Sequence, residues 1–197
     1  MLFRSLGIID MPTLMQKSSN VGATRLALAL EPRELWQTLT RVGFGSATGS
    51  GFPGESDGVL THYFDWGTIH RATLSFGYGL SVSALQLAQA YSVIANDGRF
   101  VRVSFQRLDQ PVEGVPVMRR ETASALREML ESVVGPDGTA QRARVPGYRV
   151  GGKTGTVRKS ITGGYAEDRY KAVFAGMAPI SEPRLVVVVV IDEPGGE

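Results

Sequence analysis

The ten residues YRVGGKTGTV at positions 148–157 decide how this chain is interpreted. They predict a short extended strand that carries the Lys153 cation, two threonine hydroxyls and glycines that let another backbone approach closely. Only four of the 21 basic residues are lysines, so Lys153 is conspicuous inside a Gly/Thr strand. We interpret this strand as the wall of an acyl-transfer cleft that grips a carboxylate.

A substrate with a free carboxylate next to its scissile amide needs a cation and hydroxyls at one end of such a cleft. Lys153, Thr154 and Thr156 would provide them through charge-assisted hydrogen bonds. Gly155 would keep the strand face clear, so that an extended peptide can lie along it. The backbone N–H of Thr156 could donate to a developing oxyanion.

The segment Ser18-Ser19-Asn20 is the candidate for the opposite wall of the cleft. The Ser18 hydroxyl would relay a proton to the leaving amine, and the Asn20 amide would hold the substrate's peptide group. Asn20 could equally be a simple helix cap, and Lys153 could be a solvated strand lysine. Those alternatives stay open on the residues alone.

Composition narrows the class of protein. With 197 residues, 43% of them hydrophobic, the chain suits one domain with one core. Its net charge of +2 and its scattered basic residues predict no nucleic-acid partner. The absence of cysteine excludes thiolate chemistry. The two histidines, His62 and His70, have no common metal-site spacing, so we expect surface or structural roles for them and neither metal nor cofactor.

Hydrophobic periodicity predicts the helices. Residues 1–17 favour a loop or a short helix, and 43–58 favour an ordered loop anchored by Phe44 and Phe52. The clearest amphipathic pattern is that of residues 122–134. The predicted helices are 20–30, 32–42, 83–96 (with Leu87, Ala88, Tyr91 and Ile94 inward) and 122–134.

Strands are predicted at 100–108, 148–157, 170–177 and 184–191. The expected fold class is α/β (α+β), with helices packed on a mainly antiparallel sheet. Strand 148–157 should be its edge, 170–177 should pair with it, and 184–191 should come next. The far side of 184–191 should then be an unusually apolar exposed edge.

Two glycine motifs match nucleotide-binding patterns but lack the required context. Residues 147–154 fit the phosphate-loop spacing, yet the segment before them is polar and no helical pattern follows the lysine. Residues 49–54 fit the dinucleotide fingerprint, but Pro53 stands where a helix should begin. Neither motif therefore predicts a nucleotide site.

The order of several motifs gives the chain a family resemblance that covers nearly its whole length. It is similar to the transpeptidase domain of class B penicillin-binding proteins, and most similar to the cell-division (FtsI-type) peptidoglycan D,D-transpeptidases. The motifs are KSSNVG at 17–22, GFPGE at 51–55, SFGYG at 75–79, LQLAQAY at 85–91, GKTGT at 152–156 and DEP at 192–194.

The resemblance implies a penicillin-binding-protein/serine β-lactamase-like fold and a serine acyl-enzyme cycle on stem peptides ending in D-Ala-D-Ala. β-Lactams would acylate the same serine. It also implies that Tyr78 and Phe76 line the cleft, although aromatic residues there could simply pack, and that Arg158 lies near an acidic ligand substituent. A periplasmic location at the bacterial inner membrane and a partner division glycosyltransferase among other divisome proteins are further implications.

One departure from the family pattern is large. No serine in the chain is followed by lysine three positions later, so the S-x-x-K that supplies the acylated serine and its base is missing. We therefore expect residues 1–197 to be a partial, truncated transpeptidase domain that lacks the S-x-x-K segment and the C-terminal end. Its sheet would lack two strands, and the fragment alone should be inactive.

Two other interpretations remain open. The chain could belong to a β-lactam sensor or a β-lactamase of the same fold, which the missing N-terminal segment would decide. It could also be a non-catalytic binding fragment. Neither alternative changes the expected geometry, in which Ser18, Asn20 and Lys153 converge on one small hollow.

Overall fold

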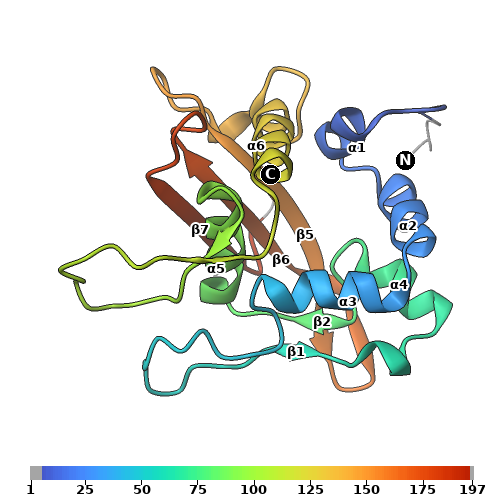
Figure 1. Cartoon of the computed structure of the whole chain (residues 1–197). Helices are drawn as coiled ribbons and strands as arrows, with labels where there is room; N and C mark the ends of the chain where they lie inside the picture. Colours follow the sequence, from blue (N-terminus) through green and yellow to red (C-terminus); the bar gives the residue numbers. More distant parts are fainter. Residues whose placement is uncertain (1–5, 196–197) are drawn as a thin grey trace.

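A computed structural model describes residues 6–195 as an α+β arrangement of helices around a three-stranded antiparallel sheet (Figure 1). The fold class is therefore as predicted. Its helices are α1 (Met11–Lys17), α2 (Asn20–Ala29), α3 (Pro32–Arg41), α4 (Thr68–Leu74), α5 (Ala84–Ala95) and α6 (Arg120–Val134), with 3-10 turns η1 (Tyr63–Asp65) and η2 (Gln141–Ala143). Its strands are β1 (Val59–Leu60), β2 (Leu80–Ser81), β3 (Arg99–Phe100), β4 (Val115–Pro116), β5 (Gly151–Ile161), β6 (Gly164–Ala178) and β7 (Leu185–Asp192).

The main sheet has the order β5-β6-β7, as predicted, although β5 and β6 run longer than expected. Lys153 pairs with Ala175, and the β5–β6 register continues to the pair Arg158 and Tyr170. β5 continues as a strand past Lys153 to Ile161, so the helix that a phosphate loop requires does not follow the lysine.

Helices α5 and α6 pack against the sheet (Figure 1). Leu130 of α6 packs with Met177 and Ile180, and Tyr91 of α5 lies against that cluster. Burial raises the pKa of Tyr91 to about 12, because the phenolate would lose its hydration. A Cβ at Gly151 would lie 2.4 Å from the Ile180 side chain, so the glycine gives α6 and the sheet room to meet.

The inward face of α5 is as predicted at Tyr91 and Ile94, which pack against the core, but differs at the start of the helix. Leu87 and Ala88 are half-buried, whereas Gln86 and Gln89 are buried. The reason is that loops containing residues 46, 57 and 101 cover this side of α5, and their carbonyls accept hydrogen bonds from the glutamine side chains. Gln86 donates to the carbonyls of residues 46 and 57, each at 2.8 Å, and Gln89 donates to the carbonyl of residue 101.

Two further predictions are wrong. Residues 101–108 form no strand, because only Arg99 and Phe100 have a partner strand, β4. Phe52 does not anchor its loop: its side chain is 63% exposed and meets Phe105 edge to face, at a centroid distance of 5.8 Å. These two loops therefore contact each other at their tips instead of packing into the core.

The outer edge of β7 has no partner strand within residues 6–195, as predicted. The alternating side chains on one face of β7 are also exposed: Leu185, Val187, Val189 and Ile191, at 44–65%. An unpaired strand with such a face is prone to pair with another chain.

The N-terminal helices are joined by polar contacts. Ser19 caps α2 through a hydrogen bond from Gly22 N–H, and α2 packs mainly on α4. The guanidinium of Arg71 on α4 donates to three carbonyls at the end of α2, those of residues 27, 28 and 30, at 2.7–3.2 Å. A cation at a helix C-terminus satisfies orphan carbonyls and favours the helix dipole.

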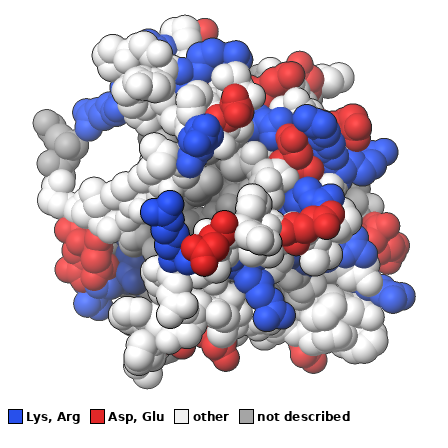
Figure 2. Space-filling model, turned by 60° about the vertical axis from the view of Figure 1, so that its left-hand side comes forward, with Lys and Arg blue, Asp and Glu red and all other residues white. Residues whose placement is uncertain are grey.

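Charges of both signs are interspersed on the face shown in Figure 2, in keeping with the small net charge. No large single-sign patch covers that face, so it lacks the electrostatic footprint of a nucleic-acid-binding surface. Within residues 6–195, no helix has the length and apolar character needed to cross a bilayer.

We predict that Gln86→Leu lowers the free energy of unfolding by about 2–3 kcal/mol, because two loop carbonyls lose the donor that the buried Gln86 supplies and α5 loses its capping box. Thermal or urea unfolding of the domain that contains this chain measures the effect. The exposed Gln106→Leu is the matched control and should change stability by less than about 0.5 kcal/mol. Equal stability of both variants would contradict the assigned role of Gln86.

Candidate active site

Ser18 lies at the tight corner between α1 and α2. It caps α1 with a left-handed backbone (φ 53°, ψ 50°), a conformation that is uncommon for a residue other than glycine. Its N–H donates to the Met15 carbonyl, and a Cβ at Gly22 would lie 2.6 Å from Leu14, so glycine there lets the helices approach. The corner presents the Ser18 side chain outward, toward β5.

Lys153 on β5 reaches this corner. Its ammonium donates to the Ser18 hydroxyl at 2.8 Å and to the Thr154 carbonyl at 2.9 Å. An ammonium has three donors, so one N–H remains for a ligand. Burial lowers the pKa of Lys153, because the charged form loses hydration.

The neighbouring loop closes one end of the site. Thr154 donates to the hydroxyl of Thr139 at 3.5 Å, and Lys17 donates to the carbonyl of Asp137 at 2.9 Å. The segment 137–139 therefore connects the end of α1 to β5. No feature of the sequence pattern indicated Thr139, because its position depends on the turn that follows α6.

Gly155 lies in the open part of β5. A Cβ built there would meet no atom within 4 Å, and its backbone is that of an ordinary strand. Neither packing nor turn geometry therefore requires a glycine at this position. The bare backbone leaves this part of the strand clear of side chains, and the binding of an extended ligand along it stays a prediction.

A second group of predicted residues gathers further along β5. The backbone N–H of Arg158 donates to the Tyr78 hydroxyl at 3.2 Å, and the Tyr78 ring meets Tyr165 edge to face at 4.9 Å. The ring centroid of Phe76 lies 5.9 Å from that of Tyr78. Together with His70 these side chains line a hollow of about 440 Å³.

The structure therefore brings Ser18 into contact with Lys153, and Tyr78 with Arg158. The exposed side chains of Asn20 and Thr156 have no hydrogen-bond partner among residues 6–195, and Asn20 lies two residues from Ser18 at the start of α2. His70 contacts the carbonyl of Gly79, whereas His62 lies among aromatic rings. No cluster of three or more potential metal ligands occurs in the part of the chain that is described.

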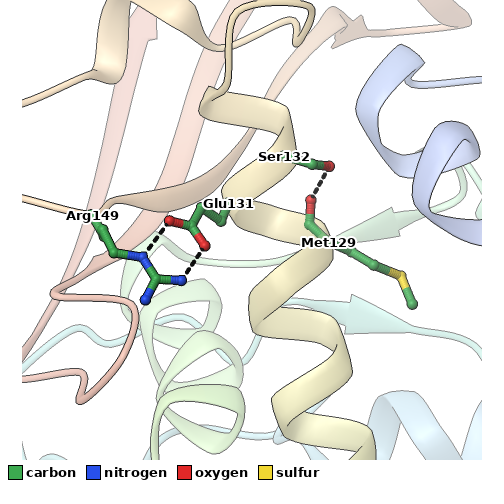
Figure 3. A network of polar contacts seen from close by, with 4 residues as sticks. All are labelled: Met129, Glu131, Ser132 and Arg149. Atoms are coloured by element: carbon green, nitrogen blue, oxygen red, sulfur yellow. Dashed lines mark hydrogen bonds and ion pairs between the residues drawn. The ribbon is translucent and has the colours of Figure 1, made fainter.

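Behind the site, α6 is fixed to the segment that leads into β5. The guanidinium of Arg149 makes two hydrogen bonds of 2.7 Å to the Glu131 carboxylate (Figure 3). These bonds lower the pKa of Glu131. In the next residue of α6, the Ser132 hydroxyl donates to the Met129 carbonyl (Figure 3). A planar bidentate pair adds directional constraint, so it helps to set the start of the strand that carries Lys153.

The fold and this lysine–serine contact at the sheet edge define the class: the chain belongs to the penicillin-binding protein transpeptidase domain family, whose model matches residues 3–197. More particularly, its relatives are named as D,D-transpeptidases. It is 45% identical over 188 residues to the probable peptidoglycan D,D-transpeptidase PbpC of Pseudomonas aeruginosa, covering 95% of this chain and 33% of the relative. It is 42% identical over 181 residues to peptidoglycan D,D-transpeptidase FtsI of Escherichia coli, covering 92% and 31%.

A solved structure agrees with this assignment. The apo transpeptidase domain of Burkholderia pseudomallei penicillin-binding protein 3 superposes with a TM-score of 0.92 at 48% identity, covering 98% of this chain and 59% of that one. The chain spans about a third of the length of the two curated relatives. The resemblance read from the motifs is thus confirmed at the level of family and fold.

We predict that Lys153 and Lys159 titrate on opposite sides of the usual lysine value of 10.5, because burial lowers the pKa of Lys153 whereas the hydrogen bonds that Lys159 donates to Glu193 and Asp192 raise the pKa of Lys159. NMR titration of side-chain-labelled lysine measures both. As the pH rises, the Lys153 ammonium, and with it carboxylate binding, should be lost first. Lys153 titrating at or above Lys159 would contradict the half-buried site.

Proposed function

We propose that this chain is the C-terminal part of a peptidoglycan D,D-transpeptidase domain that cross-links stem peptides ending in D-Ala-D-Ala through a serine acyl-enzyme. β-Lactams would bind the same site as substrate mimics. The observation that carries the proposal is the 2.8 Å contact between the Lys153 ammonium and the Ser18 hydroxyl, which come from distant segments. The names of the relatives support it.

The terminal carboxylate of the stem peptide would bind at β5. The free N–H of Lys153 and the hydroxyls of Thr154 and Thr156 supply charge-assisted hydrogen bonds to it. The peptide would lie along the strand at Gly155, where no side chain intervenes. The N–H of Thr156 would donate to the oxyanion as the carbonyl becomes tetrahedral.

Ser18 would carry the proton in the acylation step. The nucleophilic serine oxygen forms a bond to the penultimate D-Ala carbonyl, and the C–N bond to the terminal D-Ala breaks. The nucleophilic serine gives up its proton, the departing nitrogen takes one from the Ser18 hydroxyl, and the proton released by the nucleophile replaces it on Ser18. The Ser18 oxygen is held by Lys153, and its hydrogen is free to point into the cleft. Asn20, on the same helix start, would hold the peptide amide. An amine from a second stem peptide then attacks the acyl-enzyme carbonyl. A new amide bond forms, the bond to the serine oxygen breaks, and the serine takes back a proton.

The hollow beside Tyr78 and Arg158 would take the far end of the ligand. Arg158 lines it together with Tyr165, and its guanidinium makes no hydrogen bond within residues 6–195. A free guanidinium beside aromatic rings suits a ligand that carries a second acidic group. This assignment gives the aromatic residues a binding role in addition to their packing.

The acylated serine and its lysine base would come from an N-terminal S-x-x-K segment, for which residues 1–197 have no match. The same part of the protein would cover the apolar face and free edge of β7. By family, we place the enzyme at the periplasmic side of the inner membrane, in cell division, with a glycosyltransferase and other divisome proteins as partners.

We predict that the 197-residue chain alone is not acylated by a fluorescent penicillin, because the nucleophile is supplied elsewhere. Joining the chain to the preceding part of the Burkholderia domain, S-x-x-K included, should restore stoichiometric labelling. Gel fluorescence of the purified proteins measures it. Stoichiometric labelling of the isolated chain would overturn the proposed arrangement.

In the complemented protein, Lys153→Ala should slow acylation by about 30–100-fold, because a charged hydrogen-bond donor to the carboxylate is lost. The exposed Lys171→Met on β6 is the matched control and should react at the unmodified rate. If a folded Lys153→Ala variant is labelled as fast as the control, β5 is not the carboxylate-binding strand.

A further inference from the structure

The segment Asp192-Glu193-Pro194 has no part in the proposed chemistry, yet it makes a specific contact with β5. The Lys159 ammonium lies 2.9 Å from the Asp192 carboxylate and 2.7 Å from that of Glu193. The Lys159 side chain is 21% exposed, less than either carboxylate. Because β6 separates β5 from β7, this lysine crosses a whole strand to reach its partners.

Lys159 occupies the point at which the β5–β6 register breaks. Arg158 pairs with Tyr170, but Ser160 pairs with Tyr165, so one residue of β5 stands opposite four of β6. Such a bulge re-aims the side chains beside it. The direction of the strand at Lys159 therefore has to be fixed by contacts other than the regular ladder.

The backbone of Glu193 is adapted to this contact. Its φ of 49° lies in the left-handed region, which is uncommon for a residue other than glycine. Its N–H donates to the Tyr170 carbonyl at 3.0 Å, so the chain turns directly after β7. A conformation of this kind persists when its surroundings enforce it, and it often marks a functional position.

Arg158 and Lys159 are adjacent in β5, and the surroundings of their side chains show that the two point in different directions. Arg158 lines the hollow with Tyr165 and Tyr78, whereas Lys159 is held at the end of β7. Fixing Lys159 on one face therefore fixes the rotation of the strand, and with it the direction in which Arg158 projects.

We propose that Lys159, held by Asp192 and Glu193, is a positioning residue that aims Arg158 at the hollow and thereby sets the preference of the site for ligands with a second negative charge. The inference rests on the proposed function. It gives the carboxylates at the end of β7 a role in selectivity, although they touch no ligand.

The test compares two ligands that differ by one carboxylate: benzylpenicillin and its side-chain α-carboxy derivative. Rate constants of acylation are measured on the complete transpeptidase domain containing this chain. The measured quantity is the acylation rate constant for the carboxylated ligand divided by that for the uncarboxylated ligand. Lys159→Met should lower this ratio by about three- to fivefold, because the loss of a partly exposed ion pair has an effect of that size. Lys159→Arg should restore the ratio, because it keeps the cation and its reach.

Arg158→Gln should lower the same ratio, and adding Lys159→Met to it should have no further effect, because both changes act through one guanidinium. The matched control is Arg99→Met, which removes another partly exposed ion pair, with Glu113, at strand β3. It should leave the ratio unchanged. A structural role for Lys159 would alter thermal stability but not the ratio.

A Lys159→Met protein with the unmodified ratio would overturn this inference while leaving the proposed function intact. So would equal losses for both ligands, or additive losses in the double variant. Failure of the unmodified domain to react with either ligand would instead overturn the proposed function, and the inference with it. The two failures are therefore distinguishable.

Discussion

The contact between the Lys153 ammonium and the Ser18 hydroxyl is the constraint on which the site depends, because it joins segments that lie 135 residues apart. Each side of it is held independently. Ser18 is fixed by the corner between α1 and α2, and Lys153 by the pairing of β5 with β6. The half-buried position that makes the ammonium a stronger hydrogen-bond partner also lowers its pKa. The half-buried ammonium therefore loses some hydration, but its hydrogen bonds to Ser18 and to the Thr154 carbonyl hold it in a defined position.

The glycines of β5 occupy two different kinds of environment. At Gly151 and Gly152 an added Cβ would meet Ile180 and Phe174, so these positions are set by packing. At Gly155 the same Cβ would meet nothing. A glycine that the fold does not require is informative about function, because its cost in chain entropy brings no gain in packing. The proposed binding surface of β5 therefore begins where the need for tight packing ends.

Local sequence signals predicted four of the longer helices, α2, α3, α5 and α6, and the three strands of the main sheet, whose order is also as expected. The short helix α4 and the two-residue strands β1, β2 and β4 were not predicted. The prediction of a strand at 100–108 was wrong. An alternating pattern forms a strand only where a partner strand lies beside it, and in this segment only Phe100 has one. The buried glutamines of α5 were missed for a related reason. Gln86 donates to loop carbonyls 40 and 29 residues away and Gln89 to one 12 residues away, and no helical periodicity could reveal these partners.

For the candidate site, motif order indicated which segments to bring together, but it could not supply the contacts that orient them. Lys159 illustrates the limit, because its partners are 33 and 34 residues away and beyond an intervening strand. In sequence it is one more basic residue after Arg158, and only the bulge and the turn at Glu193 show that it is held. The two neighbouring cations therefore differ in what they can do. Arg158, without a partner for its guanidinium among residues 6–195, is available to a ligand. Lys159 is paired with two carboxylates, so its charge stabilises the end of β7 and is not available to a ligand.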